Sequence, residues 1–97
     1  MKNSDKERVR VTLRQYEAFL KTVECAGVSA AAQALGVSQS ALTQLLAGLE
    51  RDCGFPLLVR NRGGVHLTPA GKALLPAVQQ VCAADAHLRG RIQEVRE

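Results

Sequence analysis

Three cysteines and two histidines carry the most reactive side chains of this 97-residue chain, and their spacing indicates neither a metal site nor a catalytic pair. Cys25, Cys53 and Cys82 are widely separated and form no C-x-x-C, and neither His66 nor His87 stands at zinc-ligand spacing from them. No Ser-His-Asp, Cys-His or paired-carboxylate arrangement is suggested, nor a glycine-rich phosphate loop. We therefore expect three reduced, half-buried thiols, no metal, no cofactor and no enzyme activity.

Residues 39–51 offer a different chemistry, because short polar side chains recur there on one helical face. The opposite arc is apolar. A Gln side chain such as that of Gln39 can make a bidentate contact to adenine, and the carbon atoms of Ser or Thr suit a thymine methyl group. The polar face is formed by Ser40, Thr43, Gln44, Ala47 and Arg51, and the apolar arc by Leu42, Leu46, Leu49 and Cys53.

The positive charge is concentrated in two segments. The chain has 13 Lys and Arg against 9 Asp and Glu, which gives a net charge of +4. Residues 1–14 and 51–72 hold most of the cations, and these segments would attract a polyanion over long range. No stretch reaches the roughly 18 to 20 apolar residues that a membrane span needs, and the amino terminus lacks a signal-peptide pattern. We expect a cytoplasmic protein with no membrane partner.

A capping box and helical spacing predict the first helix over residues 13–26. The hydroxyl of Thr12 can accept from the amide of Gln15, whose side chain can reach back to the cap. Gly27 is expected to end the helix in a left-handed conformation. Residues 1–11 precede it, and we expect them to form a flexible basic arm.

The next two helices have helix-turn-helix spacing. Ser29 is expected to cap a short helix over residues 30–35, and Ser38 a longer one over residues 39–53. Gly36 makes the turn between them. This spacing lets the second helix stand out from the body and enter a major groove.

A two-stranded wing follows in the sequence. Residues 57–60 and 65–68 have the pattern of short strands, and the glycines of the intervening segment 61–64 suit a hairpin turn. Thr68 caps a last helix, with Pro69 at its first position. The predicted fold class is therefore mainly α: a winged helix-turn-helix of three helices and a two-stranded wing, followed by a long linker or dimerisation helix.

The last helix runs to about residue 95, with Pro76 expected to bend it, and it carries a second apolar pattern. Its apolar residues are spaced alternately by four and three, interrupted once by Asp85. So small a domain cannot cover this stripe with its own chain, so we expect a homodimer through the helix over residues 69–95. The alternative is that the stripe packs on the helix over residues 13–26. The stripe consists of Leu74, Val78, Val81, Leu88, Ile92 and Val95.

The order of these motifs resembles the LysR-type transcriptional regulators, from about Leu13 to Ile92. Molybdate-responsive regulators have a similar amino-terminal winged helix and are the alternative family. The resemblance is carried by residues 27–44 (Gly27-Val28-Ser29-Ala30-Ala31-Ala32-Gln33-Ala34-Leu35-Gly36-Val37-Ser38-Gln39-Ser40-Ala41-Leu42-Thr43-Gln44), by Leu49-Glu50, by Gly54-Phe55-Pro56-Leu57-Leu58-Val59-Arg60 and by Leu67-Thr68-Pro69-Ala70-Gly71.

The resemblance implies a domain that binds double-stranded DNA as a dimer on an interrupted inverted repeat. It places the helix over residues 39–53 in the major groove and the wing over residues 57–68 on the backbone or minor groove. It implies a flexible arm over 1–11, a DNA-binding domain over 12–68, a linker helix over 69–97, and an effector-binding domain outside this chain. The implied base contacts are Gln39, Ser40, Thr43 and Gln44. The implied backbone contacts are Ser29, Ser38, Arg60 and Arg62.

The sequence departs from this family on the helix over residues 39–53. The position of Gln44 often holds a basic residue, and Ala47 and Gly48 often align with charged ones. The helix has no positive charge before Arg51. The alternative function is therefore a winged helix that binds a protein and uses the long helix for assembly.

Overall fold

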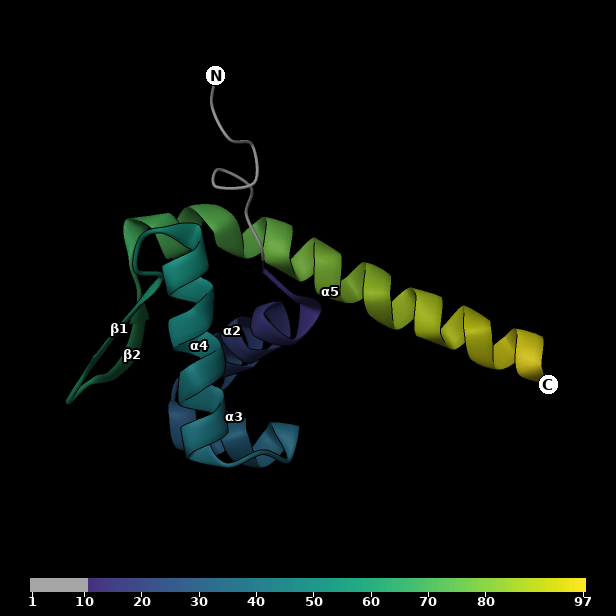
Figure 1. Ribbon diagram of the computed structural model, residues 1–97, viewed down its shortest axis with the longest axis horizontal. Helices are drawn as coiled ribbons and strands as arrows, with labels where there is room; N and C mark the ends of the chain where they lie inside the picture. Colours follow the sequence, from purple (N-terminus) through teal and green to yellow (C-terminus); the bar gives the residue numbers. More distant parts are fainter. Residues whose placement is uncertain (1–10) are drawn as a thin grey trace, which may run out of the picture.

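The computed structural model describes residues 11–97, and these fold into four helices and one two-stranded antiparallel sheet (Figure 1). The predicted winged helix-turn-helix with a long terminal helix is confirmed. The predicted arm lies outside the described residues, apart from Val11, which packs against the core. No helix in the described part of the chain is long and apolar enough to cross a membrane. The elements are α2 (Leu13–Cys25), α3 (Val28–Leu35), α4 (Gln39–Cys53), β1 (Leu58–Asn61), β2 (Gly64–Leu67) and α5 (Pro69–Arg96).

Helix α2 begins with the predicted capping box but ends one residue earlier than predicted. The Thr12 hydroxyl accepts from the Gln15 amide at 3.3 Å, and the Gln15 side chain accepts from the Thr12 amide at 3.0 Å. Ala26, with φ 57°, takes the left-handed conformation predicted for Gly27, which is extended. The amides of Ala26 and Gly27 bond back to the carbonyls of Val23 and Thr22, and this closing pair ends the helix at Cys25.

The prediction that Ser29 caps α3 is wrong. The helix begins at Val28, so Ser29 lies inside its first turn with an exposed side chain. Gly27 is the cap residue and makes no side-chain hydrogen bond. The short connection from α2 causes this shift, since the chain enters α3 immediately after the closing bonds of α2.

The turn between α3 and α4 is the predicted one. Gly36 has φ 70°, and the Val37 amide bonds back to the Ala32 carbonyl at 3.0 Å. Ser38 then caps α4, its hydroxyl accepting from the Ala41 amide at 3.0 Å. The turn therefore ends one helix and starts the next within three residues.

The core lies around α2, which packs against α3, α4 and α5. Phe19 of α2, Leu42 and Leu49 of α4, and Leu57 before β1 are its largest fully buried apolar side chains. The single buried polar residue among those described is Thr22, whose hydroxyl donates to the Ala18 carbonyl at 2.7 Å. Every buried polar side-chain atom of the described residues has a hydrogen-bond partner, so the core holds no unsatisfied polar side-chain atom among these residues.

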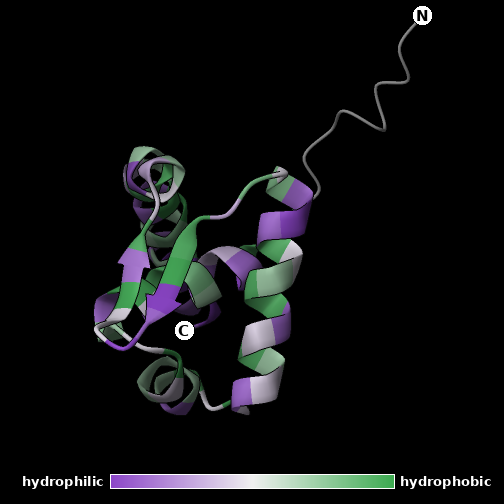
Figure 2. Ribbon diagram, turned by 90° about the vertical axis from the view of Figure 1, so that its left-hand side faces the viewer, coloured by the Kyte–Doolittle hydropathy of each residue, from purple (hydrophilic) through white to green (hydrophobic). Residues whose placement is uncertain are grey.

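The wing is a short antiparallel hairpin whose strand β2 contacts α2 and α5. Leu58 pairs with Leu67 and Asn61 with Gly64, so both strands lie one residue from their predicted positions. The Asn61 side chain accepts from the Gly63 amide at 2.8 Å, and Gly64 has φ 108°. Figure 2 shows hydrophilic residues around the tip of the hairpin.

Helix α5 continues through Pro76 and projects away from the body on the side opposite the wing (Figure 1). The Thr68 hydroxyl accepts from the Gly71 amide at 3.0 Å, and Pro69 occupies the first position, as predicted. Val78 is buried in the core, whereas every residue from Ala86 onward is exposed. The helix therefore has a packed first half and an uncovered second half.

Two glycines of α5 make a matched pair for testing how this helix is seated. A Cβ atom at Gly71 would collide with the backbone oxygen of Leu57, whereas one at Gly90 would meet nothing within 4 Å. We expect Gly71→Ala to lower the free energy of unfolding by about 2–3 kcal/mol. Gly90→Ala should raise it by about 1 kcal/mol through helix propensity. Urea unfolding followed by far-UV circular dichroism, at one protein concentration, measures both. Similar effects of the two variants would contradict the close approach at Gly71.

Candidate nucleic-acid interface

One face of α4 gathers the predicted base-reading residues. Gln39, Ser40 and Gln44 are exposed and Thr43 is half-buried. The opposite face holds Leu42, Leu46 and Leu49 in the core, so the predicted division of this helix is confirmed. Ala47 is exposed on the same side as Gln44, so the side chain that this face presents in the third turn of α4 is small.

This face of α4 carries no charge between Gln39 and Leu49. The first ionisable side chain after them is Glu50, which bonds to the base of the wing, and Arg51 lies 3.8 Å from the carboxylate of Asp52. Any recognition by this face must therefore use neutral hydrogen bonds and methyl contacts.

Gly48 belongs to the buried side of α4 and not to its exposed face. A Cβ atom at this position would lie 2.9 Å from the side-chain nitrogen of Gln15. The glycine therefore lets α4 lie close to the capping box of α2. This packing accounts for a residue that is unfavourable in helix interiors by about 1 kcal/mol relative to Ala.

The wing supplies exposed cations that are not paired within the described residues. Arg60 is on β1 opposite Val65, and Arg62 is in the turn, both with exposed side chains. No salt bridge joins either to a described residue, nor Lys72 at the start of α5. By contrast, the pairs of the helices are Lys21–Glu24, Arg51–Asp52, Arg89–Asp85 and Arg91–Glu94. The wing therefore presents exposed positive charge beside a neutral helix face.

The two predicted backbone-contact serines differ in their surroundings. Ser38 is exposed, and its hydroxyl is used as the α4 cap, next to Gln39. Ser29 is exposed in the first turn of α3 and has no side-chain partner among the described residues. Both stand near helix amino termini, where amide groups favour anions.

Glu50 holds the wing against α4, a role that the sequence analysis did not assign. One oxygen of its carboxylate accepts from the amides of Leu57 and Leu58 at 2.6 and 3.0 Å. Figure 1 shows the result, with the loop after α4 leading into the hairpin, whose strand β2 contacts α2 and α5. The sequence held one signal for this role: the Leu49-Glu50 motif places a carboxylate a few residues before a loop whose backbone amides need acceptors.

Thr68, which follows β2 and caps α5, adds further hydrogen bonds to the base of the wing. Its amide donates to the Leu57 carbonyl at 3.0 Å, and its hydroxyl donates to the Pro56 carbonyl at 2.8 Å. The same hydroxyl accepts from Gly71 in α5. The end of α4, the base of the wing and the start of α5 are thus joined by one hydrogen-bond network.

The three cysteines are free and half-buried, as predicted. Burial raises the pKa of the Cys53 thiol above its usual value, and the carboxylates of Asp52 and Glu50 raise it further. Burial likewise raises the pKa of Cys82, with smaller contributions from Glu17, Asp85 and Glu24. The thiolate forms of Cys53 and Cys82 are therefore disfavoured at neutral pH. Among residues 11–97, no three His, Cys, Asp or Glu side chains could hold a metal together.

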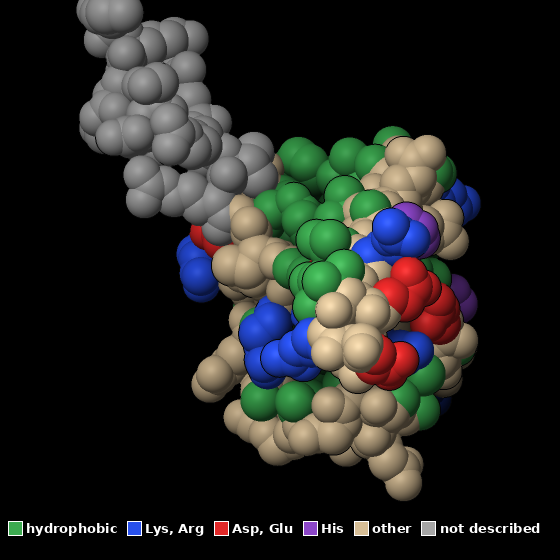
Figure 3. Space-filling model, turned by 90° about the vertical axis from the view of Figure 1, so that its right-hand side faces the viewer, with side chains coloured by type: hydrophobic (Ala, Val, Ile, Leu, Met, Phe, Trp, Pro, Cys, Tyr) green, Lys and Arg blue, Asp and Glu red, His purple; other side chains and the backbone are tan. Residues whose placement is uncertain are grey.

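The predicted dimer stripe on α5 is divided by the fold. Val78 is buried and Leu74 half-buried against the chain's own core, as the intramolecular alternative required for them. Val81, Leu88, Ile92 and Val95 are exposed. Figure 3 views the molecule from the free end of α5 and shows hydrophobic side chains gathered on the upper part of this side.

Residues 13–72 match the bacterial regulatory helix-turn-helix proteins of the lysR family. A probable hydrogen peroxide-inducible genes activator from Mycobacterium avium is 49% identical over 76 residues, which are 77% of this chain and 24% of that relative. The transcriptional regulator TfdT from Cupriavidus pinatubonensis is 41% identical over 73% of this chain and 31% of its own length. The chain thus spans less than a third of the length of each of these two relatives.

Solved structures show the same fold. The H2O2-bound C206S mutant of Corynebacterium glutamicum OxyR superposes with a TM-score of 0.85 at 34% identity, over 89% of this chain and 28% of that one. The protein of the CbnR_DBD-DNA complex superposes with a TM-score of 0.77 at 31% identity, over 90% of this chain and 100% of that one. These comparisons favour the first of the two families that the motif order suggested.

The Glu50 contacts can be tested by a substitution that keeps shape and removes charge. Glu50→Gln replaces two charge-assisted hydrogen bonds by neutral ones, so we expect the free energy of unfolding to fall by about 2 kcal/mol. Glu94→Gln is the control, because Glu94 is exposed and pairs only with Arg91 among the described residues, and its effect should stay within about 0.5 kcal/mol. Urea unfolding measures both. Equal stabilities for Glu50→Gln and the unmodified chain would show that the carboxylate does not hold the wing.

Proposed function

Because the chain belongs to the LysR family of bacterial regulatory helix-turn-helix proteins, we propose that it binds double-stranded DNA with α4 in the major groove and the wing on the backbone or minor groove. The observation that carries this proposal is the row of exposed hydrogen-bonding side chains on α4, together with the exposed cations of the wing. It acts in transcription regulation, as its relatives' names say of them. Likeness to the protein of a DNA complex supports the same use of the fold.

The face of α4 would read base edges. Gln39 and Gln44 each present an amide that can bond adenine in two places, and Ser40 and Thr43 can bond bases or contact a thymine methyl. The small side chain of Ala47 allows DNA to approach α4 closely at its third turn. None of these side chains has a hydrogen-bond partner among the described residues, so they need not break a contact with those residues before binding.

The wing and the helix ends would position the protein on the phosphates. Arg60 and Arg62 supply charge, and Ser29 and Ser38 supply hydroxyls and nearby helix amides. Because the α4 face is neutral, the salt dependence of binding should come mainly from the wing.

The protein would act as a homodimer through α5, on an interrupted inverted repeat. A two-fold symmetric protein presents two α4 helices to two half-sites of opposite orientation. Support comes from the exposed apolar residues of the second half of α5, which the described residues leave uncovered. The competing function is a winged helix that binds protein, which the uncharged α4 face favours.

Selection from a random duplex library at near-physiological salt distinguishes these functions. We expect enrichment of an interrupted palindrome, because two linked copies of α4 must read related half-sites. Gln39→Ala should then weaken binding to the selected site by about 1–3 kcal/mol and relax the preference at one base pair of each half-site. Fluorescence anisotropy with single-base-pair variants measures this.

Lys21→Ala serves as the control for that experiment, because Lys21 lies on α2 and pairs with Glu24. It should leave base preference unchanged. Equal losses of affinity of Gln39→Ala for selected and random DNA would remove Gln39 from the base-reading set. A folded protein that enriches no sequence would favour the protein-binding alternative.

Arg60→Ala should weaken binding to every DNA sequence and reduce the slope of log K against log salt by about one unit, the value expected when one phosphate is no longer neutralised. The reason is that an exposed guanidinium releases counterions when it meets a phosphate. Titrations at several salt concentrations measure the slope, with Lys21→Ala as a charge-matched control. A slope that matches the control would show that Arg60 is not at the backbone.

A further inference from the structure

Two side-chain nitrogens meet above Gly48, where α4 passes the start of α2. A Cβ atom at Gly48 would lie 2.9 Å from Nε2 of Gln15 and 3.3 Å from Nη2 of Arg51. Both nitrogens are hydrogen-bond donors, and both distances are close to those of hydrogen bonds, so one acceptor just outside this point can reach the two together. No hydrogen bond joins either nitrogen to an acceptor among residues 11–97.

The capping box of α2 fixes which way the Gln15 amide points. Its oxygen accepts from the Thr12 amide at 3.0 Å, so its nitrogen is the end that is turned toward α4. The first turn of α2 contains no acidic residue, and Arg14 stands in it, so the start of this helix is positive. This surface therefore favours an anion.

The two carboxylates beside Arg51 leave most of its guanidinium free. Glu50 accepts from two backbone amides at the base of the wing. Asp52 lies 3.8 Å from Nε of Arg51, which is too long for a hydrogen bond, and the Arg51 side chain is 75% exposed. Because Gly48 has no side chain, Nη2 of Arg51 can lie back toward the amino end of α4, the direction in which helical side chains lean.

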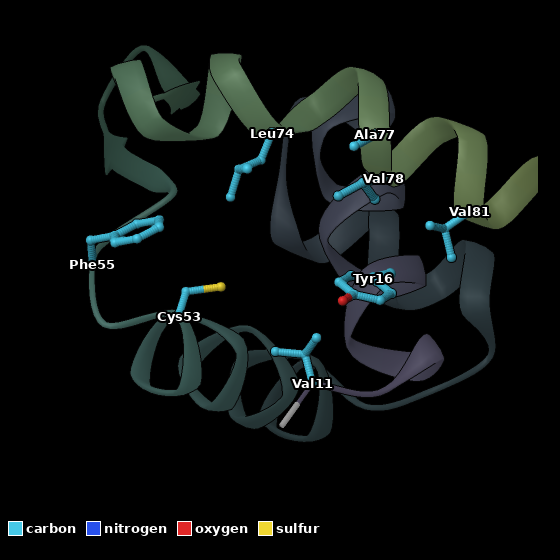
Figure 4. Close-up of a pocket in the computed structure, with 8 residues that line it drawn as sticks. All are labelled: Val11, Tyr16, Cys53, Phe55, Leu74, Ala77, Val78 and Val81. Atoms are coloured by element: carbon cyan, nitrogen blue, oxygen red, sulfur yellow. The ribbon is translucent and has the colours of Figure 1, made fainter. Parts of the chain in front are cut away.

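The start of α2 and the end of α4 also form an apolar groove with α5. This groove has a volume of about 310 Å³, and its lining includes Tyr16 of α2, Cys53 of α4, Phe55 and Val81 of α5 (Figure 4). The two donor nitrogens do not belong to its lining. The polar pair and the groove therefore occupy different faces of one packed junction, so packing sets the spacing of the two nitrogens.

The position of Arg51 along α4 decides which anion it would meet in the proposed complex. It shares the exposed face with Gln44 and Ala47. It follows Gln39 by twelve residues, which is about 18 Å along the helix axis. Since the major groove is only about 12 Å wide, a helix with its amino end at the base edges brings Arg51 to the phosphates that border the groove.

We propose that Arg51 and the side-chain nitrogen of Gln15 together bind one phosphate of the DNA backbone at the carboxyl end of α4. This inference rests on the proposed DNA binding and adds a contact that neither the wing nor the two serines provide. The guanidinium supplies charge and the amide supplies a second hydrogen bond, and the pair fixes how far α4 enters the groove.

Arg51→Gln tests the charge. With the selected duplex and a random duplex, we expect both affinities to fall by a similar factor of about three to ten, and the slope of log K against log salt to fall by about one unit. Arg51→Lys should restore the slope, because it keeps the charge. Lys21→Gln is the control, since Lys21 lies on α2 and pairs with Glu24. A slope equal to that of the control would overturn the proposal, and so would a loss of preference confined to one base pair.

Gln15→Glu tests the amide nitrogen without removing the cap. The new carboxylate can still accept from the Thr12 amide, but it places a negative charge where the phosphate would bind. We expect affinity for both duplexes to fall at least about tenfold, with an unchanged midpoint of urea unfolding. The control Gln80→Glu adds the same charge at an exposed position of α5 and should change affinity less than about threefold. Equal effects of the two variants would overturn the two-donor site.

A methylphosphonate removes the charge of one phosphate and so locates the contact. Placed singly along the selected duplex, it should weaken binding of the unmodified chain at one position of each half-site where it does not weaken Arg51→Gln further. Equal losses for both proteins at every position would overturn this contact alone, because the unmodified chain would still bind its selected site. A chain that binds no duplex refutes the proposed function and this contact together.

Discussion

The carboxylate of Glu50 connects the parts of this protein that must act together. A hairpin of two four-residue strands is marginal by itself and has little apolar surface with which to fix its position. Here two amides at its base donate to a carboxylate on α4, and Thr68 ties the second strand to the same loop. The same threonine starts α5. The angle between α4, the wing and α5 therefore depends on one charged side chain and the hydroxyl that completes its network.

In the proposed function, affinity for DNA and specificity for its sequence would come from different elements, the wing and α4. The exposed face of α4 is neutral, so in the proposed DNA complex it would contribute hydrogen bonds and close contact but little long-range attraction. The exposed cations lie on the wing, a few residues after the Glu50 contacts. In the proposed complex, the hydrogen bonds between α4 and the base of the wing would let the wing's cations bring the neutral face of α4 to a groove in a fixed register.

The two halves of helix α5 have different surroundings. Its first half completes the core, and Gly71 allows it to approach the backbone at Leu57 closely enough to do so. Its second half has no partner among the described residues and continues the groove beside Phe55. The hydrogen bonds around Glu50 and Thr68 hold the start of α5, so they also fix the direction in which its free half projects. Within the LysR family, this gives a physical link between where the wing sits and how two copies would be spaced.

The sequence alone predicted the helices, the turn at Gly36, the hairpin and the two faces of α4, because capping residues, glycines and apolar periodicity act locally along the chain. The family followed from the order and spacing of the motifs. Sequence reasoning misplaced the end of α2 and the cap of α3, since the closing bonds at Ala26 and Gly27 depend on how the next helix begins. The Glu50 contacts, the tight seat of Gly71, the buried position of Gly48 and the division of the α5 stripe were decided by tertiary structure. Each depends on a contact between residues that belong to different elements, and the local periodicity of the sequence does not specify which elements meet.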